Sequence, residues 1–288
     1  MSYSQIKFLN CSICQSKNIN MCHPYVRDNE EIQVLKCGDC GLVFLSSLDH
    51  VADDFYEESG MLSGDVNLKK YRQQSYKDDL RRANNLREKL IGKTVLDFGC
   101  GAGGFLHEIQ KYAETAEGVE LDRHINKAIN AEGIKCYPNI ANINGTYDVI
   151  TLFHVVEHLV NPNEILNQLK KYLNPGGVII IEVPNADDAL LTLYKSNKFA
   201  DFTYWSCHVY LYNNHTLQRL VEQAGYKVKL LKQIQRYSLS NHLYWLSHGK
   251  PGGHNHFGLI DNVILDKEYE NALAAMGKCD TLMVEIFL

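Results

Sequence analysis

The sequence predicts an α/β fold in which a mostly parallel sheet is covered by helices on both faces. Short apolar runs alternate with helical segments from residue 94 onward, and the 288-residue chain is 45% apolar and 22% charged. Continuous apolar runs are typical of strands buried on both faces, as in parallel sheets. This length and composition suit one large globular domain with a small additional module.

Seven apolar segments are predicted as strands of this sheet. They lie at residues 94–98, 116–120, 135–137, 147–153, 178–183, 226–235 and 281–288, with helices predicted at 105–115, 123–132 and 163–173. The final strand follows a long connection, so we expect the C-terminal segment to insert back into the sheet. Residues 237–279 are predicted to be an insertion, and long insertions in compact domains typically serve as lids or binding loops.

Four cysteines near the N-terminus form two CxxC pairs. Cys11 and Cys14 make the first pair, Cys37 and Cys40 make the second, and 22 residues separate the pairs. Zn²⁺ prefers a tetrahedron of soft ligands, and a CxxC turn places two thiolates on one side of it. Four cysteine ligands leave no open coordination position, so the sequence predicts a structural zinc site in a zinc-ribbon-like module at residues 1–50.

Cys22 and His23 lie between the two pairs and are alternative ligands with less favourable spacing. The polar residues 51–90 are predicted to be a helical connector, followed by the main domain at 91–288 with its insertion. The total of nine cysteines is odd, which argues against a disulfide framework.

Charge and hydropathy exclude several classes of partner. The net charge is −5, and the basic residues between Lys69 and Arg87 alternate with acids, which is typical of a solvated helix face. Nucleic acid is therefore an unfavoured partner. No apolar run reaches the ~20 residues that span a bilayer, and residues 1–20 lack a signal-peptide core. We expect a cytoplasmic protein without a membrane span.

The densest motif is the segment Val95-Leu-Asp-Phe-Gly-Cys-Gly-Ala-Gly-Gly104. Gly99 and Gly101 allow the strand-to-helix turn to approach a ligand closely. Their spacing also fits a dinucleotide fingerprint, but the Asp97 carboxylate would repel a pyrophosphate and attract the cationic groups of S-adenosylmethionine. Glu120 ends the second strand, where an acid typically holds ribose hydroxyls. We therefore expect a Rossmann-like site for S-adenosylmethionine.

Further motifs are Asp148-Val-Ile, Glu157-His158 and Leu173-Asn-Pro-Gly-Gly177. Together with the glycine motif they resemble the motif series of class I S-adenosylmethionine-dependent methyltransferases over about residues 90–235. This resemblance implies a doubly wound, mostly parallel seven-stranded sheet. The CxxC pairs, Glu182-Val-Pro-Asn185 and Asp54-Phe-Tyr-Glu-Glu58 extend the resemblance to zinc-ribbon-fused methyltransferases of deoxysugar, antibiotic and surface-polysaccharide (capsule) pathways.

The resemblance also implies which residues bind the cofactor. The methionine end is assigned to Asp97, Gly99 and Gly101, the ribose to Glu120, the adenine to Asn139 and Ile140, and the sulfonium to Phe153 and His154. Cys100 and Leu121 are further candidates for binding the cofactor.

The segment His154-Val-Val-Glu-His158 supplies the candidate general bases. It follows the fourth strand, at the edge where open α/β sheets bind ligands. Methyl transfer is an in-line displacement, and a general base improves a neutral hydroxyl as nucleophile. His154 is the first choice and His158 the second, unless His158 only braces the local helix. Glu157 would orient either one or bind an acceptor hydroxyl, and if a helix begins at His154 the two histidines share one face. His208 is a further candidate base.

We expect O-methylation of a small-molecule acceptor, a nucleotide-linked sugar or a sugar-linked group. Two pairs at the start of the insertion, Arg236-Tyr237 and Asn241-His242, are candidates to contact its anionic part. C- or N-methylation of a deoxysugar and methylation of a phosphoryl or phosphoramidate group are alternatives, followed by a nucleic-acid or protein methyltransferase and a non-catalytic binding module. The HxxEH pattern of metalloproteases also matches, but its place after a parallel strand disfavours that interpretation.

Overall fold

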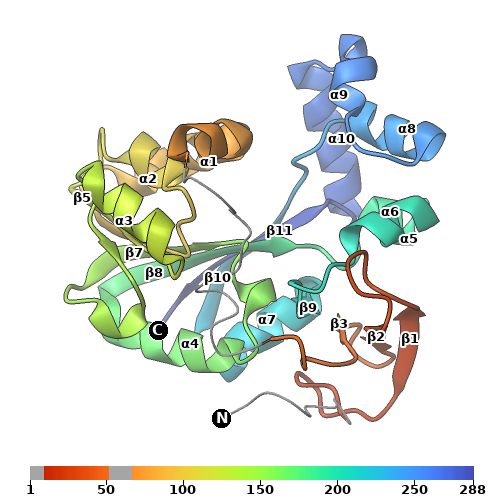
Figure 1. Cartoon of the computed structure of the whole chain (residues 1–288), viewed down its shortest axis with the longest axis horizontal. Helices are drawn as coiled ribbons and strands as arrows, with labels where there is room; N and C mark the ends of the chain where they lie inside the picture. Colours follow the sequence, from red (N-terminus) through yellow and green to blue (C-terminus); the bar gives the residue numbers. More distant parts are fainter. Residues whose placement is uncertain (1–9, 52–66) are drawn as a thin grey trace.

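The computed structural model describes residues 10–51 and 67–288, and Figure 1 shows a central sheet with helices on both sides. The Asp54–Glu58 motif lies outside the described residues. In spatial order, the seven strands are β10 (Lys227–Ile234), β11 (Thr281–Phe287), β8 (Leu173–Pro184), β7 (Tyr147–Phe153), β4 (Thr94–Phe98), β5 (Thr115–Val119) and β6 (Cys136–Tyr137). The last five of these strands run parallel, and β11 is antiparallel to both its neighbours. This confirms the predicted fold class, including the return of the C-terminal segment into the sheet.

Neighbouring residues of the central strands are buried in opposite layers. Val95 and Val149 belong to the apolar cluster beneath one set of helices, whereas Leu96 and Ile150 belong to the cluster beneath the other. Figure 1 shows the first set above the sheet and the second set below it. The upper helices are α1 (Leu68–Leu90), α2 (Gly104–Ile109) and α3 (Arg123–Ala131), and the lower helices are α4 (Pro162–Leu169) and α7 (Asn214–Gln223). Burial on both faces explains why these strands are continuous apolar runs.

Two predicted boundaries were wrong. The helix expected over 105–115 ends at Ile109, and the helix expected over 163–173 is α4 followed by a 3-10 turn at Lys170–Tyr172. In the second case, β8 already begins at Leu173, where it pairs with Tyr147. A residue that pairs in the sheet is not available to the preceding helix.

The N-terminal part forms a second, antiparallel sheet of β1 (Ile19–His23), β2 (Val34–Cys37) and β3 (Val43–Leu45). Its fourth strand is β9 (Tyr210–Leu211), which comes from the segment between β8 and α7. The apolar residues of this sheet and of the lower face of the main sheet form one continuous cluster. The cysteine-rich part is therefore packed as an extension of the main core.

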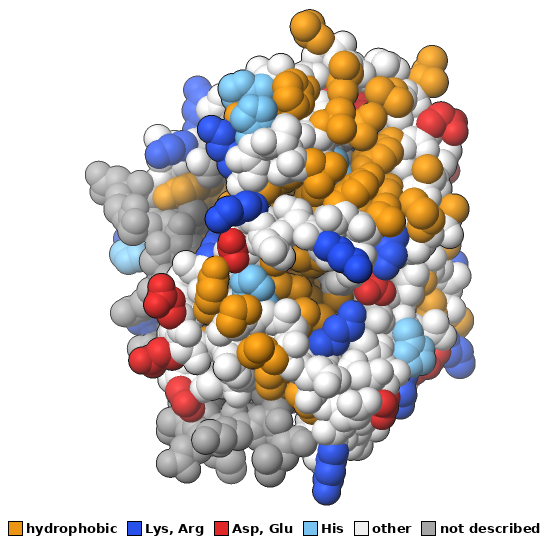
Figure 2. All heavy atoms as spheres, turned by 90° about the vertical axis from the view of Figure 1, so that its right-hand side faces the viewer, with side chains coloured by type: hydrophobic (Ala, Val, Ile, Leu, Met, Phe, Trp, Pro, Cys, Tyr) orange, Lys and Arg blue, Asp and Glu red, His pale blue; other side chains and the backbone are white. Residues whose placement is uncertain are grey.

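The remaining helices lie in the two connections that flank β9, β10 and β11. They are α5 (Ala189–Thr192) and α6 (Asn197–Thr203) after β8, and α8 (Leu239–His248), α9 (Gly253–His256) and α10 (Val263–Ala275) between β10 and β11, where a 3-10 turn lies at Gly258–Ile260. Two other 3-10 turns follow β6, at Ile140–Asn142, and β7, at Val156–His158. The predicted insertion is thus a helical extension that projects from the sheet in Figure 1. Exposed apolar side chains, among them Leu246, Leu259 and Val263, lie on it, and Figure 2 shows hydrophobic side chains gathered over this part.

Across residues 10–51 and 67–288, no helix combines the length and apolarity needed to cross a membrane.

Candidate active site

A cavity of about 710 Å³ lies at the carboxyl ends of β4, β5 and β7. It is the place where ligands bind in open α/β sheets. Eight residues predicted to bind the cofactor line it, namely Gly99, Gly101, Glu120, Leu121, Asn139, Ile140, Phe153 and His154, and so does His158. Four other predicted site residues are absent from its lining: Asp97, Cys100, Glu157 and His208.

The glycine turn after β4 has a steric requirement at Gly99. Its φ angle is +76°, and a Cβ atom at this position would lie 2.5 Å from Cγ2 of Val155. The N–H groups of Gly99 and Cys100 both donate to the carbonyl of Val119, at 2.8 and 3.0 Å, which ties the turn to the end of β5. The Cys100 side chain faces Cys136, with 3.7 Å between the sulfurs, so this residue contributes to packing behind the turn.

Two carboxylates stand on either side of this turn. Asp97 is 3% exposed, and its Oδ1 accepts a hydrogen bond from Thr151 Oγ1 at 2.7 Å. Burial raises the pKa of Asp97 to about 7. Glu120 accepts hydrogen bonds from the N–H groups of Gly101 and Asp122, each at 2.9 Å, and burial raises its pKa as well. The turn therefore carries two carboxyl groups whose ionised forms attract a cationic ligand and oppose a pyrophosphate.

His154 occupies a left-handed backbone turn at the end of β7, with φ +55°. Its Nδ1 lies 3.0 Å from Glu157 Oε1 and its Nε2 lies 3.0 Å from Nη1 of Arg236. The Glu157 carboxylate only accepts and the guanidinium only donates, so these two contacts suit a neutral ring with the proton on Nδ1. Nε2 also lies 3.5 Å from Oε1 of Glu182, a contact that suits a protonated ring. The partners on both ring nitrogens fix the orientation of the imidazole.

The prediction that His154 and His158 share one helical face was wrong. The left-handed conformation of His154 ends the strand, and the following 3-10 turn begins only at Val156. His158 instead directs Nδ1 to the carbonyl oxygen of Cys207, at 2.7 Å. His208 packs against His158 with 5.0 Å between ring centroids, and burial together with His158 lowers the pKa of His208 to about 3.

Helix α1 forms a wall of the cavity that sequence reasoning missed. Its residues Tyr71, Ser75, Asp78 and Arg82 line the cavity, although the segment was predicted to be a solvated face. They recur at helical spacing on one face, and Leu86, four residues after Arg82, continues that face as a buried residue. A polar stripe with this period was the available signal, but nothing in the sequence shows that such a stripe faces a cavity.

The α1 wall is held by a cluster of charges around Glu182. This carboxylate is 1% exposed and accepts from Arg81 Nη2 at 2.8 Å and from Arg82 Nη2 at 2.7 Å. Burial alone would raise its pKa, but His154 and the two guanidinium groups outweigh burial and hold the pKa well below its usual range. Arg236 binds Asp78 through its Nε, 3.0 Å from Oδ1, and through Nη2.

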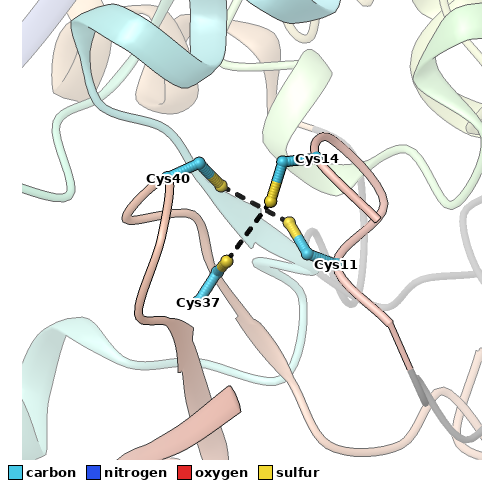
Figure 3. Close-up of side chains that lie close together, drawn as sticks. All are labelled: Cys11, Cys14, Cys37 and Cys40. Carbon is cyan, nitrogen blue, oxygen red and sulfur yellow. Dashed lines mark hydrogen bonds between the residues drawn. The ribbon is translucent and has the colours of Figure 1, made fainter. Parts of the chain in front are cut away.

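The two CxxC pairs meet in the N-terminal sheet (Figure 3). The sulfurs of Cys11 and Cys40 are 3.4 Å apart, those of Cys14 and Cys37 are 3.5 Å apart, and all four lie within 4.8 Å of one another. Four thiolates at ~2.3 Å from one ion are about 3.8 Å apart, so the cluster fits a tetrahedral metal.

The two alternative ligands lie elsewhere. The sulfur of Cys22 contacts the hydroxyl of Tyr204, and Nε2 of His23 lies 3.3 Å from Oδ1 of Asp201. Both partners belong to α6 or the residue directly after it, so these side chains brace the N-terminal sheet against the main domain.

Comparison with known proteins agrees with the fold. Residues 68–231, more than half of the chain, match the family described as methyltransferase domain. The chain therefore belongs to this family, and its class is that of the S-adenosylmethionine-dependent methyltransferases. A chain of the complex between the Haloferax volcanii Trm112 methyltransferase activator and its putative methyltransferase aligns with a TM-score of 0.50 at 11% identity, covering 75% of this chain and 92% of that one.

Two similar proteins are named ubiquinone biosynthesis O-methyltransferase. The protein from Paraburkholderia xenovorans is 30% identical over 107 residues, which are 33% of this chain and 46% of that protein. The protein from Burkholderia pseudomallei is 26% identical over 173 residues, 53% of this chain and 75% of that protein. The chain thus spans about half of the first relative and three quarters of the second.

Replacing Gly99 by Ala should destabilise the protein more than the same change at Gly133. Both glycines have positive φ, +76° and +84°, but an added Cβ meets Val155 only at Gly99. We expect ~1–2 kcal/mol from the backbone conformation at both positions, and about 1–3 kcal/mol more from overpacking at Gly99. Urea unfolding of the two variants measures this difference, and equal losses would contradict the steric requirement.

Proposed function

We propose that this chain is an O-methyltransferase that transfers the methyl group of S-adenosylmethionine to an anionic small molecule, namely a nucleotide-linked sugar. The observation that carries the proposal is the position of His154. Its imidazole is oriented by Glu157, with 3.0 Å from Nδ1 to Oε1, and it lines the same cavity as the glycine turn and Glu120. A candidate base and a candidate donor site therefore share one cavity.

The donor half of the cavity suits a nucleoside. Glu120 stands where a ribose is held in this fold, and the apolar Leu121 and Ile140 flank the same wall. The carboxylates of Asp97 and Glu120 favour the cationic amino group and sulfonium of the donor.

The acceptor half suits an anion. Arg82 and Arg236 both line the cavity, and guanidinium groups bind phosphate and carboxylate through paired hydrogen bonds. The relatives named as O-methyltransferases support an oxygen acceptor. The two arginines support an acceptor that carries a phosphate. The proposal that this acceptor is a nucleotide-linked sugar rests on the resemblance to sugar methyltransferases.

In the proposed reaction, the acceptor phosphate binds the Arg236 guanidinium. The acceptor hydroxyl then occupies the position beside His154 Nε2 that Nη1 of Arg236 holds in the structure. The hydroxyl proton passes to Nε2 while the oxygen lone pair attacks the methyl carbon. The S–CH₃ bond breaks as the O–CH₃ bond forms, and its electron pair stays on sulfur, which gives neutral S-adenosylhomocysteine. Glu157 then faces an imidazolium and stabilises its charge.

Replacing His154 by Ala should lower turnover by ~10²–10⁴-fold and leave donor affinity nearly unchanged, because general-base catalysis acts on the chemical step. The measurement is S-adenosylhomocysteine release with a panel of nucleotide sugars, with mass spectrometry of the product and calorimetry of donor binding. His215→Ala, at an exposed residue, is the control. Unchanged turnover would remove His154 as the base, and turnover only on RNA or protein would overturn the acceptor class.

Donor affinity should rise between pH 6 and pH 8. The pKa of Asp97 is about 7 because the carboxyl is buried, so it is mostly neutral below that pH and mostly ionised above it. A cationic donor favours the ionised form, and we expect about a tenfold change in Kd across this range. Calorimetry on the wild type and on Asp97→Asn tests this, since the variant has no carboxyl to titrate. A pH slope that survives in Asp97→Asn would show that another group is responsible.

We also propose that the four-cysteine cluster holds a structural zinc ion. Cys40→Ser should release this ion and lower the Tm of the whole chain, because the cysteine-rich sheet continues into β9 and shares its core with the main domain. Cys22→Ser, at an exposed cysteine outside the cluster, is the matched control, because a serine hydroxyl keeps a hydrogen-bonding group beside Tyr204. Elemental analysis and thermal unfolding measure both effects. An unchanged Tm in Cys40→Ser would mean that the cluster holds no structural ion.

A further inference from the structure

A second group of metal-ligating side chains lies beside the proposed base. Glu157, His158 and His208 each place one ligand atom within 4.8 Å of the others. Two of them come from the turn after β7, and His208 comes from the segment that precedes β9. Residues far apart in the sequence thus bring two imidazoles and a carboxylate to one point, and this triad is distinct from the four-cysteine cluster.

Glu157 has a buried oxygen that the rest of the molecule leaves unsatisfied. The residue is 0% exposed, and Oε1 binds His154, but Oε2 has no hydrogen-bond partner among the described residues. Nδ1 of His208 is also buried and has no hydrogen-bond partner within the part of the chain that the structure describes. Buried polar atoms are normally satisfied, and a charged oxygen without a partner is especially costly. A cation between these groups would satisfy both.

The hydrogen bonds around the triad prepare its members as ligands. Nδ1 of His158 lies 2.7 Å from the carbonyl oxygen of Cys207. Because a carbonyl only accepts, Nδ1 must carry the proton, and the neutral ring then has its lone pair on Nε2. Metal-bound histidines are usually oriented in this way, by donating the other ring N–H to a carbonyl or carboxylate. The contact between His154 and Glu157 Oε1 orients the carboxylate ligand in the same manner.

We propose that Glu157, His158 and His208 bind a divalent transition-metal ion at the wall of the active-site cavity. Two imidazoles and one carboxylate suit Zn²⁺, Fe²⁺ or Mn²⁺, and three protein ligands leave coordination positions open. His158 lines the cavity, so an ion held by this triad would lie at the cavity wall. This last step rests on the proposed function: the ion would polarise the acceptor hydroxyl and lower its pKa, which would ease its attack on the methyl group. The ion keeps its oxidation state, and the hydroxyl proton leaves to His154 as above.

Mn²⁺ is the probe of choice because it prefers oxygen and nitrogen ligands and does not suit a site of four thiolates. The free ion is counted by electron paramagnetic resonance as it is added to the purified full chain. We expect one Mn²⁺ to bind per wild-type chain, and elemental analysis after dialysis against Zn²⁺ to find two zinc ions. Glu157→Gln and His208→Ala should each weaken Mn²⁺ binding by at least ~10-fold and reduce the zinc count to one. His215→Ala should change neither value.

The result that overturns the site is a wild-type chain that binds no Mn²⁺ and holds only one zinc ion. Equal Mn²⁺ affinity in wild type and in a folded His208→Ala variant, as judged by circular dichroism, also overturns it. Donor calorimetry and S-adenosylhomocysteine release separate this failure from that of the proposed function. If methyl transfer persists without Mn²⁺ or added metal, the function stands and the metal role falls. If Mn²⁺ binds but no acceptor is methylated, the site stands and the proposed function falls.

Discussion

The buried carboxylate of Glu182 imposes the constraint on which the acceptor half of the cavity depends. A charge that is 1% exposed needs compensation, and here Arg81 and Arg82 of α1 supply it at 2.8 and 2.7 Å. Removing one partner of a buried pair is strongly destabilising, typically by about 3–5 kcal/mol, because the other charge stays unpaired. Helix α1 is therefore tied to the carboxyl edge of β8, and its polar face becomes a wall of the cavity.

The same pairs organise the residues that line the proposed acceptor half of the cavity. Arg82 stacks on the Phe153 ring, with 4.6 Å to the centroid, and Asp78 on the preceding turn binds Arg236 after β10. Burial opposes the charge of Asp78, but Arg236 and its neighbours lower the pKa to about 2, so the pair stays ionised at any ordinary pH. Helix α1 and the residues after β10, which are 158 positions apart in the sequence, are thus joined by charge.

The sheet could be predicted from the sequence, and most residues assigned to the donor line the cavity, because both follow local rules. Apolar runs such as Tyr147–Phe153 and the turn at Gly99 carry their signal within a few residues. The acceptor half was not predictable in this way. Arg82 was assigned to a solvated face, and His158 was expected to share a face with His154, since neither the long-range partner Glu182 nor the positive φ of His154 is visible in the sequence. Contacts across 100 residues depend on tertiary packing, which composition and periodicity do not report.

The left-handed turn at His154 directs the side chains of the five-residue segment His154–His158 toward two different sets of partners. A regular helix would have placed both histidines on the same face. With φ at +55°, His154 turns toward Arg236, while Glu157 and His158 continue into a 3-10 turn directed at Cys207 and His208. Glu157 lies between the two groups, with one oxygen on His154 and the other buried without a partner in the described chain. A change in the charge near that second oxygen is therefore transmitted through a single carboxylate to the imidazole that we propose as the base.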